Sequence, residues 1–475
     1  MSSMLPGWQK SKDLGDMMAK TPNPPCSPGE IYDVNITDLN HRGEGVGKLA
    51  GYTLFIPLAL PGERAHVKII ATRKKYAQAG LLSIDKSSPH RAKPPCSYYP
   101  QCGGCRLQHL DYKQQLDWKQ ERVAETIRRI AGEEPHIEPV RGMNNPFNYR
   151  NKAEIHFEQV KGKVKAGFYE PFSHDIVDIE SCPVQHPSNN RLIKALRLAA
   201  RDFTCGTFTG NGSSKLPFQR AIIRSSFASG ASLLALAGPE SHKASSAAEM
   251  KQLASLAEMI RTYSGASLEG IVFLPQKGSK NEEITLYGRP YLEENIAAFT
   301  FRISARSFFQ VNTAQAEILF EKALSLAGSP RTLIDLYCGT GTFALYLAQT
   351  AGQVTGIDSD RSAINDARAN ARLNKSSNLE FVLGRSEDNP GLFLKGSKPK
   401  TFIINPPRKG CSDPLLQALA EAGPERIVYV SCNPATLARD LKSLHQKGYK
   451  ARTINPVDMF PHTSHVETVC LLTNK

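Results

Sequence analysis

Cys432 is the residue of this chain whose type and position most clearly suggest chemistry. It follows the apolar and β-branched run RIVYVS and is followed at once by Asn433 and Pro434. This pattern predicts a strand, a turn at the cysteine and then a helix. Because open α/β sheets bind ligands at the carboxyl ends of their strands, we interpret Cys432 as a nucleophile in a crevice. A buried thiol that only packs is the structural alternative.

A cofactor site is predicted at the same edge of the sheet. The stretch DLYCGTGTF, residues 335–343, indicates a turn in which the backbone passes close to a ligand. Asp358 ends the next predicted strand about 20 residues on, where a carboxylate can accept both hydroxyls of a ribose. Ala344 stands where a dinucleotide-binding turn has its third glycine, so S-adenosylmethionine (SAM) is favoured. A turn without any ligand is the alternative.

A cysteine beside SAM is useful when the acceptor carbon is a weak nucleophile, as C5 of uracil is. A thiolate that adds to C6 turns the ring into an enolate, whose C5 can attack the methyl group. A base must then remove the C5 proton before the thiol can leave. Glu467, at the start of the last predicted strand, is the predicted base, with His465 as the alternative. A glutamate that is merely solvated is the structural alternative.

Asn405 lies in the stretch INPPRKG, residues 404–410, which ends another predicted strand at the same edge. In amino-methyltransferases a similar Asn-Pro-Pro loop ends in an aromatic residue that stacks on a flipped base. Arg408 occupies that place here, which argues against methylation of an exocyclic nitrogen.

The elements that must position these residues are predicted by the alternation of strands and helices from about residue 331 onward. This rhythm is typical of a Rossmann-like α/β domain with a mostly parallel sheet, here a methyltransferase domain over residues 291–475. Residues 89–290 are predicted to form a central α+β domain. Short alternating runs over residues 29–88 predict a small antiparallel β-barrel, and residues 1–28 a flexible tail.

Composition and charge indicate the partner. A net charge of +14 favours a polyanion, most often nucleic acid, over the alternative of a merely basic protein. Arg73, Lys74 and Lys75 beside Tyr76 suit an RNA backbone and a stacked base, although lysines also protect strand edges. The stretch MSSMLPGWQKSKDLGDMMAK has no signal-peptide core, and no apolar run suits a bilayer. We therefore expect a cytoplasmic protein with no membrane partner.

Cysteines are unusually many for a reducing compartment, with ten in the chain, so some are expected to ligate a metal or act in catalysis. Cys96, Cys102 and Cys105 have the spacing C-x5-C-x2-C, and Cys182 can supply a fourth ligand. Four thiolates suit either a [4Fe-4S] cluster or structural zinc, and the spacing alone does not choose. A redox pair in CGGC is disfavoured because no thioredoxin-like pattern surrounds it.

Five stretches together resemble the RNA uracil-5-methyltransferase family, in the family's order and over the whole C-terminal domain: SARSFFQVNTAQAE, DLYCGTGTFAL, INPPRKG, YVSCNPATLARDL and HTSHVETVCLL. The resemblance implies that Cys432 is the nucleophile and Glu467 the proton acceptor. It also implies contacts to SAM from four further residues, Gln310, Tyr337, Asp358 and Asn405. Asp358 stands where Glu is usual in the family, and Asn405 stands where many members have Asp.

The same resemblance extends to the rest of the chain. The barrel of residues 29–88 resembles a TRAM domain, an RNA-binding module. The branch of the family that acts on 23S ribosomal RNA typically carries a [4Fe-4S] cluster on this cysteine pattern, so the resemblance favours iron–sulfur over zinc. The implied function is C5 methylation of a uridine in 23S rRNA. We expect a monomer, which gel filtration would test. The alternatives are the same reaction on tRNA and a non-catalytic RNA-binding or ribosome-assembly factor.

Overall fold

The computed structural model describes residues 24–160, 163–203, 216–238, 247–265, 267–275, 283–387 and 401–474. The chain divides into two compact units, Met1–Pro89 and His90–Lys475. Among the described residues, no helix is long and apolar enough to cross a membrane.

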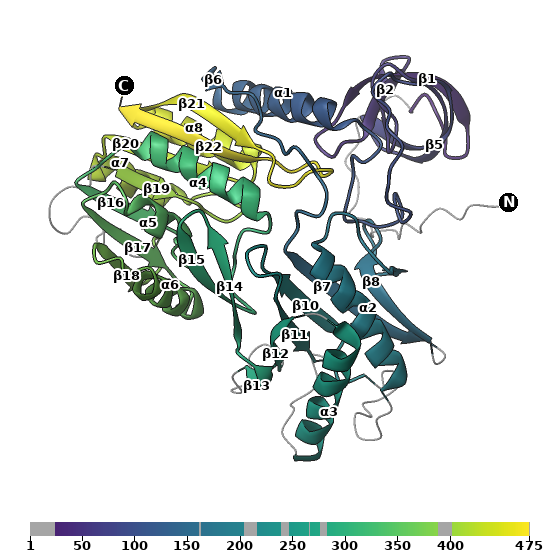
Figure 1. Ribbon diagram of the computed structural model, residues 1–475. Helices are drawn as coiled ribbons and strands as arrows, with labels where there is room; N and C mark the ends of the chain where they lie inside the picture. Colours follow the sequence, from purple (N-terminus) through teal and green to yellow (C-terminus); the bar gives the residue numbers. More distant parts are fainter. Residues whose placement is uncertain are drawn as a thin grey trace, which may run out of the picture. The chain divides into compact units, whose positions relative to one another are not determined.

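The first unit contains a closed five-stranded barrel with the order β1-β2-β3-β5-β4 (Figure 1). Its strands are β1 (Ile31–Leu39), β2 (Gly45–Leu49), β3 (Tyr52–Ile56), β4 (Arg64–Thr72) and β5 (Tyr76–Lys86). Alternate apolar residues such as Val34 and Ile36 point into the barrel, as the period of two requires. One pair, β3 with β5, is parallel, because β5 lies between β3 and β4 and not beyond β4 as in a meander.

A seven-stranded sheet forms the central part of the second unit, in the order β13-β12-β11-β10-β7-β8-β9. Helices α2 (Pro187–Asp202) and α3 (Ala247–Ser264) share one hydrophobic core with it. The strands are β7 (Lys152–Val160), β8 (Lys163–Tyr169), β9 (Ile176–Asp178), β10 (Arg220–Ser225), β11 (Ser232–Ala237), β12 (Leu268–Leu274) and β13 (Ile284–Gly288). A separate hairpin, β14 (Tyr291–Ile296) and β15 (Phe299–Ser304), follows.

An eight-stranded sheet carries the predicted chemistry, with the order β18-β17-β16-β19-β20-β22-β21-β6. The strands are β16 (Thr332–Leu336), β17 (Gln353–Asp358), β18 (Leu379–Leu383), β19 (Thr401–Ile404), β20 (Arg426–Ser431), β21 (Tyr449–Val457), β22 (Glu467–Asn474) and β6 (His136–Ile137). The five strands from β18 to β20 are parallel, whereas β22 runs antiparallel to both of its neighbours. The predicted mostly parallel α/β sheet is therefore confirmed.

Helices cover both faces of this sheet, and alternate strand residues point to opposite faces. Val428 and Val430 of β20 join the core under three helices, α4 (Thr313–Ala327), α5 (Thr342–Leu347) and α6 (Arg361–Leu373). Ile427 and Tyr429 join the other core, under α1 (Tyr112–Ala131), α7 (Asp413–Ala422) and α8 (Pro434–Gln446). Burial on both faces explains why these strands are near-continuous apolar runs.

Helix α1 and strand β6 lie within the range predicted for the central domain, yet they belong to the eight-stranded sheet. Val123 and Ile127 of α1 are fully buried in the core that α7 and α8 cover, and Figure 1 shows α1 beside α8 at the β6 end of the sheet. The chain therefore contributes one helix and one strand to this sheet before it forms the central part. A domain boundary at residue 290 remains a prediction.

Candidate active site

Four of the predicted site residues end, or directly follow, parallel strands. Tyr337 follows β16, Asp358 ends β17, Asn405 follows β19 and Cys432 follows β20. The strand order reverses between β16 and β19, and the crevice at such a switch point is where open α/β sheets bind ligands. The structure therefore brings all four residues to one edge of the sheet.

The turn after β16 is shaped to approach a ligand. Gly341 has a φ of 78°, and a Cβ there would lie 2.8 Å from the ring of Phe381, so only glycine fits. The Asp358 carboxylate accepts the backbone N–H of Gly339 at 2.9 Å and that of Asp360 at 2.9 Å. Each carboxylate oxygen keeps a further lone pair. Asp358 can therefore accept two ribose hydroxyls while it holds the turn.

The other predicted SAM contacts surround this turn. Tyr337 has a φ of 61°, and its hydroxyl donates to Glu387 Oε1 at 2.8 Å. Glu387 lies just beyond β18 and was not predicted, because nothing in its local sequence marks it. Gln310 is buried just before α4, and its carbonyl accepts a hydrogen bond from Asn151 Nδ2 at 3.0 Å. The half-buried Asn405 donates its backbone N–H to the carbonyl of Leu336 on β16.

Cys432 and Glu467 lie at the adjoining ends of two neighbouring strands. The antiparallel pair β20 and β22 ends with Ser431 opposite Thr468, so the next residue on each strand is Cys432 and Glu467. Ser431 and Thr468 are directly opposite, and such residues have Cα atoms roughly 5 Å apart, so Cys432 and Glu467 leave the sheet at neighbouring points. Burial, and then the charge of Glu467, raises the pKa of the Cys432 thiol. Burial also raises the pKa of the Glu467 carboxyl to about 7.

Arg408 supplies the positive charge at this pair. Its carbonyl accepts from Asn433 Nδ2 at 3.2 Å, which ties the Asn-Pro-Pro loop to the turn after Cys432. Its guanidinium opposes the effect of burial and lowers the pKa of both Cys432 and Glu467. The sequence showed Arg408 only as a missing aromatic residue, whereas the structure gives it an electrostatic role.

His465, the alternative base, is a poorer acceptor of a proton. Burial of part of its side chain, followed by the charge of Arg408, lowers the pKa of His465 to about 4. A group with that pKa is a weaker base than a carboxyl whose pKa is about 7, and general bases work best near the operating pH. Glu467 is therefore the better candidate.

The four cysteines of the predicted cluster lie together in the second unit. Burial, and then the charges of Cys182, Cys102 and Cys96, raises the pKa of Cys105 to about 12. Burial likewise raises the pKa of Cys182 to about 11, with Cys102 and Cys96 contributing. All four side chains are partly exposed, and a cavity of about 160 Å³ opens between Cys96 and Cys182. The segments around residues 100 and 182 thus form one thiol-lined site.

Basic groups line a separate hollow of about 1080 Å³ on the central part. Its cations come from the hairpin β7–β8 and from α2: Lys163, Lys165, Lys194, Arg197 and Arg201. Two acids, Asp178 and Glu180, also line the hollow, and Asp178 pairs with Arg197, so the five cations exceed the acids and favour an anion. In the barrel unit, Arg73, Lys74 and Lys75 are exposed, and the Tyr76 ring packs against Phe55 with centroids 5.2 Å apart. Both surfaces suit a phosphate backbone.

Comparison with known proteins agrees with this geometry. Residues 279–475 match the tRNA (uracil-5-)-methyltransferase family, and residues 26–82 match the TRAM domain. An uncharacterized RNA methyltransferase of Clostridium tetani is 39% identical over 460 residues, which cover 94% of this chain and 97% of the relative. Another, from Halalkalibacterium halodurans, is 38% identical over 455 residues, covering 94% and 98%.

A solved structure is similar over nearly the whole chain. It is Pyrococcus abyssi tRNA (uracil-54, C5)-methyltransferase in complex with S-adenosyl-L-homocysteine, with 29% identity and a TM-score of 0.72. The similarity covers 93% of this chain and 99% of that one.

The fold, the residues at this edge of the sheet and these relatives define an SAM-dependent RNA methyltransferase. The chain belongs to the RNA uracil-5-methyltransferase family. The family resemblance, the TRAM domain and the class of enzyme expected from the sequence are thereby confirmed.

Proposed function

We propose that this protein methylates C5 of one or more uridines in 23S rRNA, with Cys432 as the nucleophile and Glu467 as the acceptor of the C5 proton. The observation that carries the proposal is that Cys432 and Glu467 each lie one residue beyond the last pair of β20 and β22, Ser431 with Thr468, and that the charge of Glu467 raises the pKa of the Cys432 thiol. A planar uracil above this pair can meet the thiol at C6 and the carboxylate at C5.

The reaction balances with these two groups and SAM. The Cys432 thiolate adds to C6, and the electron pair moves to form an enolate. C5 then attacks the methyl carbon, the sulfonium bond breaks, and S-adenosylhomocysteine leaves. Glu467 takes the C5 proton, the C5–C6 double bond re-forms, and the thiolate departs. Arg408 assists by favouring the thiolate and the carboxylate.

SAM is proposed to lie at the switch point, with Asp358 on its ribose. Tyr337 begins the turn after β16, Asn405 follows the neighbouring strand β19, and Gln310 lies just before α4. Asp358 is shorter than the glutamate usual in the family, but its carboxylate is fixed by two backbone amides. Asn405 offers an amide that can donate as well as accept, where an aspartate can only accept.

The four thiols are proposed to hold a [4Fe-4S] cluster. Thiolates around a single tetrahedral zinc lie roughly 3.8 Å apart, given a Zn–S bond of about 2.3 Å. Among the described residues, no three of the cysteine sulfurs lie within 4.8 Å of one another. The group of side chains that does meet this limit is Asp33, His66 and Asp85. The wider spacing of the thiols fits a larger group. A cluster held by Cys96, Cys102, Cys105 and Cys182 would crosslink the segment of residues 96–105 to the segment around residue 182.

The proposal prefers 23S rRNA over tRNA because the family branch that acts on 23S rRNA combines a TRAM domain with this cysteine pattern. The runner-up is tRNA, since the similar solved structure is by its name a tRNA enzyme. We further propose a monomer that works in the cytoplasm, where its RNA substrate is found and thiols stay reduced.

The test is tritium release from RNA labelled at C5 of uridine, with purified protein and SAM. Release from 23S rRNA but not from tRNA is expected, together with loss of release in Cys432→Ala. Release from tRNA alone would transfer the proposal to tRNA. Methyl incorporation without release would exclude C5 chemistry, and activity that survives in Cys432→Ala would exclude the nucleophile.

Iron and sulfide analysis, with Cys182→Ser as the comparison, tests the cluster, and zinc without iron would contradict it.

A further inference from the structure

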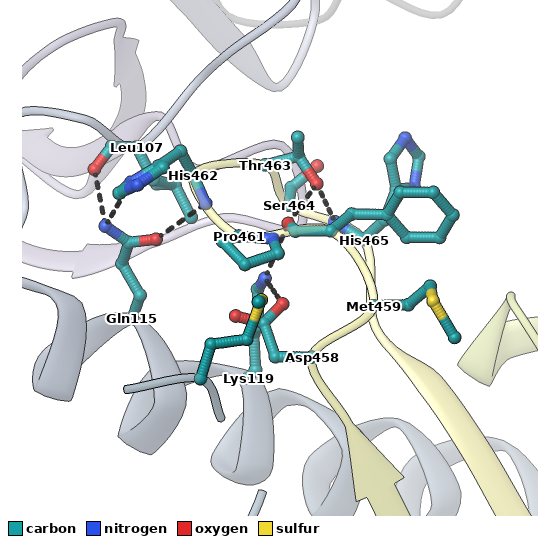
Figure 2. Close-up of polar contacts among 12 residues, drawn as sticks. Leu107, Gln115, Lys119, Asp458, Met459, Pro461, His462, Thr463, Ser464 and His465 are labelled. Carbon is teal, nitrogen blue, oxygen red and sulfur yellow. Dashed lines mark hydrogen bonds and ion pairs between the residues drawn. The ribbon is translucent and has the colours of Figure 1, made fainter. Parts of the chain in front are cut away.

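The loop between β21 and β22, residues 458–466, leads directly into Glu467. Figure 2 shows this loop beside Gln115 and Lys119 of helix α1 and beside Leu107. Five of its carbonyls accept hydrogen bonds from outside the loop. Three side chains donate to the first carbonyls: Asn312 Nδ2 to Met459, Lys119 Nζ to Phe460 and the Tyr149 hydroxyl to Pro461. The backbone N–H groups of Arg106 and Leu107 donate to the carbonyl of His462. The Arg122 side chain donates to the carbonyl of Ser464. Hydrogen bonds along its length therefore fix the segment that leads into Glu467.

Gln115 of α1 joins the two segments. Its side chain is fully buried, and its Oε1 accepts the backbone N–H of His462 at 3.0 Å. Its Nε2 donates to the carbonyls of Leu107 at 3.0 Å and Leu110 at 2.8 Å, and it lies 3.2 Å from His462 Nδ1. One side chain thus fixes both the loop and the segment whose amides hold the His462 carbonyl (Figure 2).

His462 needs this support because its backbone is strained. Its φ is 66°, in the left-handed region that residues with a Cβ rarely adopt. Such a conformation persists only where the surroundings determine it. The His462 ring also stacks on Phe147, with centroids 4.4 Å apart. Without its partners, we expect the backbone at residue 462 to relax and to shift the start of β22.

A buried ion pair fixes the other end of the loop. Lys119 Nζ lies 2.5 Å from Asp458 Oδ1, and both side chains are fully buried. The Tyr112 hydroxyl donates to Asp458 Oδ2 at 2.8 Å. Because α1 supplies Tyr112, Gln115 and Lys119 from successive turns, one helix face holds the loop at residues 458, 460 and 462.

We propose that Gln115 is a positioning residue for the methylation step, which holds the residue 458–466 loop so that Glu467 stays aimed at C5 of the uracil. The inference rests on the proposed function, in which Glu467 removes the C5 proton. Gln115 itself touches neither RNA nor SAM in this mechanism. Its loss therefore slows proton removal while both substrates still bind.

The experiment compares the full-length Gln115→Met variant with Gln120→Met as a matched control. Gln120 lies on the same helix and donates to the carbonyl of Ile137 on β6, away from the loop. Single-turnover reactions on C5-tritiated RNA give the rate of tritium release and the fraction of RNA covalently bound to Cys432. Gln115→Met is expected to slow release at least tenfold and to accumulate the adduct, with affinities for SAM and RNA within about twofold. Gln120→Met is expected to match the wild type.

Two further variants make the outcomes distinguishable. Glu467→Gln must accumulate the adduct, and if it does not, the proposed function fails. If Glu467→Gln accumulates the adduct and Gln115→Met does not, only the positioning role is overturned. Should Gln115→Met fail to fold, Tyr149→Phe removes a single hydrogen bond to the loop and decides the question. It is expected to slow release two- to fivefold, and an unchanged rate overturns the inference.

Discussion

The pH dependence of proton removal tests the assignment of Glu467 most directly. Burial raises the pKa of its carboxyl to about 7, and only the carboxylate can accept the C5 proton. Since each pH unit changes the ratio of the two forms tenfold, the carboxylate makes up roughly 9% at pH 6, half at pH 7 and about 91% at pH 8. The rate of tritium release is therefore expected to rise about tenfold from pH 6 to pH 8.

Formation of the Cys432 thiolate also increases with pH, so the assay must separate the two steps. Samples from one single-turnover reaction are divided for tritium release and for covalent adduct on a denaturing gel. If proton removal by Glu467 limits the reaction, the adduct accumulates as the pH falls toward 6. If thiolate formation limits it, release falls and no adduct accumulates. The second result would refute the assignment of the pH dependence to Glu467.

A substitution of Arg408 tests the same prediction in a second way. Its guanidinium lowers the pKa of Glu467, and a nearby opposite charge typically contributes about one unit or more. In Arg408→Gln, the midpoint of tritium release is therefore expected to move upward by about one pH unit. Lys409→Gln is the control, because Lys409 is the next residue and is exposed. Equal shifts in both variants would mean that the general surface charge, not Arg408, sets the midpoint.

Three further predictions follow from the same contacts. Because the folded-state pKa of Glu467 is about 7 and its ordinary value is 4.5, deprotonation on raising the pH destabilises the fold. Urea unfolding of Glu467→Gln should show a gain of about 3 kcal/mol at pH 8 and less than about 1 kcal/mol at pH 5, and equal gains would contradict the buried carboxyl. Asp358→Ala should weaken SAM binding in calorimetry by about tenfold or more and leave RNA binding unchanged. Lys165→Glu with Lys194→Glu should weaken RNA binding and flatten its salt dependence, and an unchanged salt slope would exclude the basic hollow from the RNA interface.

The sequence predicts which residues lie at this edge of the sheet because each of them follows a local pattern. The apolar run before Cys432 and the acid at the end of β17 mark strand ends, and parallel strands bring their ends to one edge. Glu467 was placed at the start of a strand, but its position opposite Cys432 depends on the insertion of β22 between β20 and β21. That pairing joins distant segments, and no local periodicity encodes it.

Other features escape sequence analysis for the same reason. Helix α1 has ordinary amphipathic spacing, which does not say which sheet receives its apolar stripe. Gln115 and Lys119 resemble solvated helix residues until the loop at 458–466 buries them. The parallel pairing of β3 with β5 likewise depends on the order in which the barrel closes.

The contacts that fix the loop before Glu467 also bear on how this protein matures. Lys119 and Asp458 are separated by 339 positions along the chain, and closing so long a connection is entropically costly and slow. The strands from β16 to β22 can pair through far shorter connections, whereas β6 joins β21 from a distant part of the chain. The edge of the sheet that carries Asp358 and Cys432 is therefore expected to form before the loop fixes the proposed base, Glu467. A newly made chain would pass through a stage in which it binds its substrates and can form the covalent adduct with RNA. Only later would it be able to release the product.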